Sequence, residues 1–156
     1  MEFSIAEMIP KWLPHQANSS RILCLMNLQF ANLDQLQGAL YILQNSPNLE
    51  QLEVINMNPA LENMHLDVQP TLSYLEATNC LDQTLDRLKT INIFRVEISR
   101  PLLLFIKLLL DRSPTLEKIS ITPSLTADAN EKYNFAKDVM LFPRASSKAE
   151  LHYLDP

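Results

Sequence analysis

A nine-residue stretch occurs twice in this chain. Ser46–Val54 reads Ser-Pro-Asn-Leu-Glu-Gln-Leu-Glu-Val, and Ser113–Ile121, 67 residues later, reads Ser-Pro-Thr-Leu-Glu-Lys-Ile-Ser-Ile. Each copy follows an apolar run of helical period. Because proline cannot continue a helix and moves the residue before it out of helical geometry, each Ser-Pro pair predicts the end of a helix. The alternating residues that follow predict a strand with one buried face. The repeated unit is therefore helix, turn and strand.

The same apolar position of the strand pattern recurs at five points along the chain. These positions are Leu23, Leu52, Ile91, Ile119 and Leu151, separated by 29, 39, 28 and 32 residues. A Leu-x-x-Leu-x-Leu strand at such intervals is typical of leucine-rich repeats, whose units take about 20 to 29 residues. The longest interval predicts an insertion of roughly ten residues within 57–84.

Strands that alternate with helices predict a parallel sheet with right-handed crossover connections. We therefore expect an α/β fold, a leucine-rich-repeat-like solenoid with the parallel sheet on one face and helices on the other. The helix that Ser99 caps is apolar on all sides, so neighbours must cover both of its flanks. Strands are expected at 21–30, 49–55, 88–93, 116–122 and 149–154, with a short strand at 70–76, and the other helices at 33–45 and 130–141.

The beginning of the chain gives a separate expectation. Residues 1–20 contain two prolines and predict an irregular entry loop, and Ser20 occupies the position where the repeat pattern calls for its first leucine. We therefore expect the strand at 21–30 to have an exposed edge and to be the least stable strand. Trp12, which lies between two prolines, is either an anchor for a partner or a cover for this first repeat.

Composition argues against several classes of function. The chain has a single glycine and no glycine-rich phosphate loop, and its net charge of −5 provides no basic stripe for nucleic acid. No apolar run reaches the roughly 18 residues of a membrane span, and the acidic N-terminus does not resemble a secretory signal. Cys24 and Cys80 have no metal-binding spacing. We therefore expect a reduced protein of the cytoplasm, the nucleus or both, with no cofactor.

Few residues suggest catalysis. Three histidines lie at no metal-ligand spacing and beside no nucleophile pattern, namely His15, His65 and His152. Two acidic pairs could serve a small hydrolase, although strand and helix surfaces carry such pairs routinely, namely Glu50 with Glu53 and Asp82 with Asp86. We therefore expect that the chain is not an enzyme.

The outward strand positions are the candidate binding residues. They would form one face of the sheet and carry polar groups of mixed charge, namely Gln51, Glu53, Thr90, Asn92, Lys118, Ser120 and His152. Such a face suits the binding of a protein, and the alternative is an ordinary solvated sheet face.

Much of the chain resembles a known family. The segments 75–82, 88–91, 99–110, 113–118 and 142–150 resemble the FBD region that closes plant F-box/FBD/LRR-repeat proteins, and the segments 9–14, 23–25 and 46–49 resemble their last leucine-rich repeats. The resemblance implies two parts of one continuous solenoid, a repeat segment at 1–84 and an FBD-type region at 85–156.

The resemblance also implies a function. In such proteins an F-box contacts the adaptor of a cullin-RING ubiquitin ligase, and the repeats hold the target. The stretch before Leu23 is too short to hold an F-box. We therefore expect a non-enzymatic protein-binding module with an unknown target protein, either a truncated product or a stand-alone binder. The alternative is an accessory or substrate-recruiting component that joins the ligase through another contact.

Overall fold

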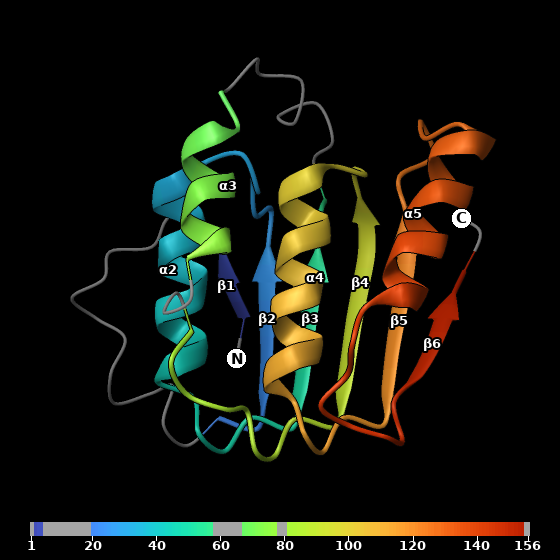
Figure 1. Cartoon of the computed structure of the whole chain (residues 1–156). Helices are drawn as coiled ribbons and strands as arrows, with labels where there is room; N and C mark the ends of the chain where they lie inside the picture. Colours follow the sequence, from blue (N-terminus) through green and yellow to red (C-terminus); the bar gives the residue numbers. More distant parts are fainter. Residues whose placement is uncertain (1, 5–19, 58–66, 78–80, 155–156) are drawn as a thin grey trace.

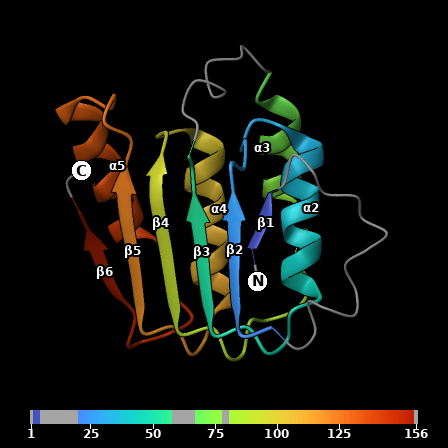
Figure 2. The same cartoon turned by 180° about the vertical axis from the view of Figure 1, so that it is seen from behind.

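The computed structural model describes residues 2–4, 20–57, 67–77 and 81–154. Six parallel strands form one sheet in the order of the chain: β1 (Glu2–Ser4), β2 (Ile22–Met26), β3 (Gln51–Ile55), β4 (Thr90–Val96), β5 (Lys118–Pro123) and β6 (Glu150–Tyr153). The helices of the described residues are α2 (Leu33–Gln44), α3 (Gln69–Glu76), α4 (Arg100–Arg112) and α5 (Ala129–Leu141). These helices all lie on one face of the sheet (Figures 1 and 2). The α/β class and the parallel sheet are thus confirmed.

The five equivalent apolar positions predicted from the repeat are aligned across the sheet. Leu23 pairs with Leu52, Leu52 with Ile91, Ile91 with Ile119, and Ile119 with Leu151. The first four side chains are at most 1% exposed, whereas Leu151 on the outermost strand is only partly buried. This aligned row, packed under the helices, is the centre of the hydrophobic core.

A tight turn precedes the strand in three successive units. In each, the backbone N–H of the fourth residue donates to the carbonyl of the first: Leu49 to Ser46, Leu88 to Leu85, and Leu116 to Ser113. The first and fourth residues of all three turns are buried. The second turn, 85–88, lacks the Ser-Pro pair, so the geometry of the unit recurs even where its sequence does not.

The helix signals in the sequence act as expected. The Asn32 side chain accepts from the Gln35 N–H at 3.2 Å at the start of α2, and the Ser99 side chain accepts from the Leu102 N–H at 3.2 Å at the start of α4. The helices α3 and α5 both contact α4, so its two flanks are covered as predicted. α5 begins one residue earlier than expected, because Asp128 caps it by accepting from the Glu131 N–H at 2.8 Å.

Two predicted elements were wrong. The segment expected as a strand at 70–76 is helix α3, in which Pro70 occupies the first turn and Thr71 and Leu75, four residues apart, are buried. A strand there has no place in the sheet, because β3 and β4 pair directly. The first strand was also predicted too long. β2 ends at Met26 because Asn27 adopts a positive φ of 58°, a conformation that asparagine tolerates.

The N-terminal expectations also need correction. Residues 2–4 form β1, which pairs in parallel with Cys24–Met26, so they are not loop and that side of β2 is not an open edge. Trp12 and the rest of 5–19 lie outside the described residues. Within the predicted insertion, 58–66 and 78–80 lie outside them as well.

The core row gives a direct prediction for stability. Leu52 is fully buried, so Leu52→Ala is expected to lower the free energy of unfolding by about 2 to 5 kcal/mol of a total near 5 to 15. Leu125→Ala is the matched control, because the same truncation at a side chain that is 74% exposed should change it by less than about 0.5 kcal/mol. Denaturant melts measure both. Equal midpoint shifts for the two variants would contradict the burial of Leu52.

The two Ser-Pro turns differ in one testable respect. Ser46 Oγ donates to the Ile42 carbonyl at 2.6 Å, whereas the buried Ser113 Oγ has no hydrogen-bond partner among the described residues. Ser46→Ala should therefore cost about 1 kcal/mol, while Ser113→Ala should be neutral or stabilising, because it removes a buried unsatisfied hydroxyl. Thermal melts of the two variants measure the difference. The opposite order would refute this account of the turns.

Candidate interaction surface

The sheet has one face that no helix of the described residues covers, and we call it the helix-free face. The seven residues predicted as outward all belong to strands whose alternate side chains form the core. The register brings them into two rows across the sheet. The first row contains Gln51, Thr90 and Lys118, and the second contains Glu53, Asn92, Ser120 and His152. Residues far apart in the sequence, such as Glu53 and Asn92, are therefore neighbours on one surface.

Several of these polar groups are engaged within the protein. The Gln51 Nε2 amide donates to Glu53 Oε1 at 2.8 Å, and His152 Nε2 lies 3.2 Å from Glu150 Oε2. Lys118 is exposed and forms no ion pair with any residue that the structure describes. Ser120 is buried at 8% exposure, and the other six residues form a broad polar surface on which the charged groups are spread across the strands. Ser120 and His152 are register partners, but no hydrogen bond joins their side chains. Such a surface can bind a protein through hydrogen bonds and charges.

A third row of the helix-free face was missed by the sequence reasoning. Met26, Ile55 and Phe94 are paired in register at the carboxyl ends of β2, β3 and β4. Met26 and Ile55 are half-buried, and Phe94 is 42% exposed. We call these three residues the apolar row. It places large apolar side chains beside the polar rows of the same face.

Next to the apolar row, strand β4 has a bulge. The register with β5 shifts between Phe94 and Val96, so Arg95 is an additional residue, and its φ is 59°. The Arg95 guanidinium lies 5.2 Å from the centre of the Phe94 ring, within the range of a cation–π contact. The sequence contains a signal for this bulge: Ile93 and Val96, both buried, are three residues apart, a spacing that strict alternation does not allow.

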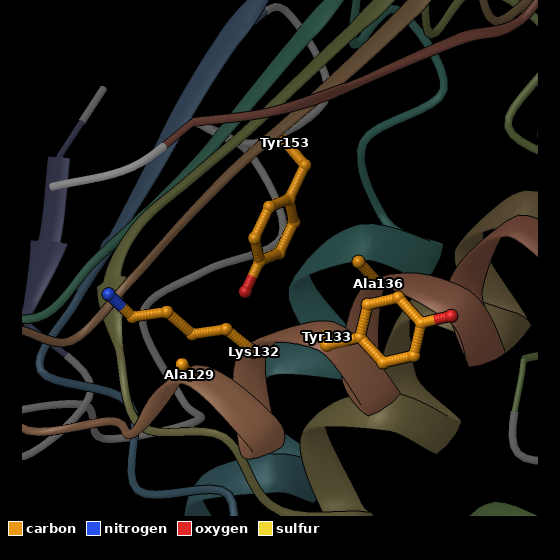
Figure 3. Close-up of a pocket in the computed structure, with 5 residues that line it drawn as sticks. All are labelled: Ala129, Lys132, Tyr133, Ala136 and Tyr153. Atoms are coloured by element: carbon orange, nitrogen blue, oxygen red, sulfur yellow. The ribbon is translucent and has the colours of Figure 1, made fainter.

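The helix side has two shallow hollows. One, of about 420 Å³, lies between α5 and β6 and is lined by Ala129, Lys132, Tyr133, Ala136 and Tyr153 (Figure 3). The ring of Tyr153 also packs on Phe135, with 6.4 Å between the ring centres. The other, of about 410 Å³, lies beside α3 and α4. The described lining of the first hollow consists of two alanines, two phenols and one amine.

Those of the remaining candidates that the structure describes are not grouped into a site. Asp86 Oδ1 accepts from the Thr84 hydroxyl at 2.6 Å, and Asp82 and Asp86 are both exposed. Cys24 is buried in β2. Among the described residues, no three His, Cys, Asp or Glu side chains are grouped closely enough for a metal ion, and no helix is long and apolar enough to cross a membrane. His15, His65 and Cys80 lie outside the described residues.

Comparison with known proteins gives one relevant similarity. The chain is 30% identical over 129 residues to an F-box/FBD/LRR-repeat protein of Arabidopsis thaliana. The match covers 80% of this chain but 29% of that protein, so the chain spans less than a third of the relative's length. No family model and no solved structure matches the chain. The similarity supports a relationship with the F-box/FBD/LRR-repeat family.

Proposed function

We propose that this chain is a non-enzymatic protein-interaction module and that its helix-free face binds a target protein. The observation that carries the proposal is the one-sided covering of the sheet. Parallel sheets occur almost only with both faces covered, because their crossover connections usually place helices on both faces. Here the helices of the described residues cover one face, while the other presents polar rows and the partly exposed apolar row. A protein partner would cover that second face.

We further propose that the module is a leucine-rich-repeat solenoid with an FBD-type region at 85–156. Three features support this proposal: strands that pair in the order of the chain, turns of the same geometry in successive units, and the similarity to an F-box/FBD/LRR-repeat protein. Stacked repeats present their strands as one extended surface, which such proteins use for binding.

A second candidate function follows from the name of the relative, which includes an F-box. In this alternative the chain is an accessory or substrate-recruiting component of a cullin-RING ubiquitin ligase, attached through a contact other than an F-box. The two candidates differ in what copurifies with the tagged chain from plant cells. Adaptor and cullin subunits would favour the ligase component, and target proteins without them would favour the simple binder.

The helix-free face can be tested by a single substitution at its centre. Asn92→Arg adds a long charged side chain to the second row and should reduce recovery of a specific partner by about tenfold or more, because an unmatched interface charge costs over 1.4 kcal/mol. Asn134→Arg makes the same change at an exposed position on α5, on the helix side, and should leave recovery unchanged. The measurement is quantitative mass spectrometry of proteins captured by each tagged chain.

Thermal melts of both variants ensure that they are compared as folded proteins. If Asn92→Arg captures the same partners in the same amounts as the original chain, the helix-free face is not the binding surface. If Asn134→Arg alone loses them, the binding surface lies on the helix side.

A further inference from the structure

We propose that the apolar row and Arg95 together form the anchor of the helix-free face, and that they bind a partner segment in which a carboxylate stands beside a large apolar side chain. This inference rests on the proposed function, because it names the partner chemistry of the same face. We call Met26, Ile55, Phe94 and Arg95 the anchor site.

The apolar part of the anchor site is partly exposed to water, and burying it against a partner would be favourable. Phe94 is 42% exposed and Met57, just beyond the end of β3, is 59% exposed. On the next strand the register partner of Phe94 is Thr122, which is 6% exposed, so the apolar row ends at β4. Aromatic residues, methionine and arginine are the types enriched at protein interfaces, and the binding energy is concentrated in a few such residues.

The conformation of Arg95 is the second observation. A residue other than glycine at a φ of 59° costs roughly 1 to 2 kcal/mol, because its Cβ crowds the neighbouring carbonyl. Bulges of this kind usually place glycine at the left-handed residue. The chain instead has an arginine there, and the bulge sends its side chain across the ring of Phe94 on the helix-free face. Strained residues cluster at functional sites, where the strain positions a side chain for its task.

The charge of Arg95 identifies the partner. Arg95 is exposed and forms no ion pair with any residue that the structure describes, although the chain as a whole carries a net charge of −5. A guanidinium can donate two parallel hydrogen bonds to a carboxylate while its flat face stays stacked on an aromatic ring. The Phe94 ring fixes the guanidinium and also continues into the apolar row. A ligand that satisfies both parts has an acidic group directly beside a large apolar side chain.

The carboxylate could come from an aspartate or glutamate side chain or from the end of a chain. Both sources offer the same two oxygens to Arg95. Random-peptide libraries displayed on phage can sample both sources in two formats. In one format each peptide ends in a free carboxyl group, and in the other the peptide is continued at both ends by the coat protein. The folded chain serves as the only bait, and the selected peptides are afterwards tested for binding to Phe94→Ala.

The enriched peptides are then synthesised and their affinities measured in solution. Each acidic peptide is compared with its amide counterpart, in which the side-chain or terminal carboxylate is replaced by a carboxamide. We expect enrichment of an acidic group next to an aromatic or large aliphatic residue. Arg95→Gly should lower the affinity for the acidic peptide about tenfold, as expected for one charge-assisted pair, and hardly change that for the amide.

Two further variants make the test specific. Arg95→Gly should also raise the melting temperature, since glycine tolerates the positive φ, so a loss of binding cannot be ascribed to unfolding. Arg100→Gln removes the same charge from an exposed position on α4 and should leave the affinity unchanged. If Arg95→Gly is more stable than the original chain but binds the acidic peptide more weakly, Arg95 is a residue whose backbone strain serves binding.

The outcomes separate the inference from the proposed function. Peptides that are blocked by Asn92→Arg but unaffected by Phe94→Ala and Arg95→Gly would overturn the anchor site and leave the helix-free face as the binding surface. Selected peptides that none of these variants affects would overturn both. A selection that enriches no acidic peptide overturns the carboxylate part of the inference.

Discussion

The covering of only one face of a parallel sheet is the constraint on which the rest of this structure depends. The strands follow one another in order from β1 to β6, and the helices of the described residues, α2 to α5, all pack on one face. The aligned row of Leu23, Leu52, Ile91 and Ile119 is sealed beneath those helices at 1% exposure or less. Because the strand side chains alternate, the same register that aligns the core also aligns the outward residues.

This alignment determines which outward side chains lie next to each other on the helix-free face. Polar groups of different strands, such as Glu53 and Asn92, become neighbours across the sheet. Along β3, Gln51 donates a hydrogen bond to Glu53. At the carboxyl ends of the strands the outward residues are apolar, and the bulge at Arg95 adds a strained cation to them. Exposed apolar surface and backbone strain both lower stability, and both occur here at one place. That coincidence distinguishes this part of the face from an ordinary solvated surface.

The sequence was a good guide to features that depend on local signals, such as helix caps, or on the spacing of the repeats. The alignment of Leu52 with Ile91 follows from repeat spacing, and the start of α4 follows from Ser99 as its cap. The helix at Gln69–Glu76 was missed because, in so short a segment, spacings of two and four residues are both present. The pairing of Glu2–Ser4 with β2 depends on a contact between distant residues, which no local pattern reports.

The candidate surface was only half predicted. Polar outward residues such as Asn92 were recognisable, because they interrupt an apolar strand. Phe94 was not recognised, because the strand was expected to end at 93, whereas β4 continues to Val96. The roles of the polar residues remain predictions, whereas their positions on one face are established.

Methyl NMR of the chain with a bound partner, or with a peptide enriched on it, tests the central claim most directly. The helix-free face has methyl groups at Met26 and Ile55, and the helix side has exposed ones at Met140 and Leu141. The account predicts that binding shifts the signals of Met26 and Ile55 and leaves those of Met140 and Leu141 in place. Shifts confined to Met140 and Leu141 would show that the helices are the recognition surface and would contradict the account.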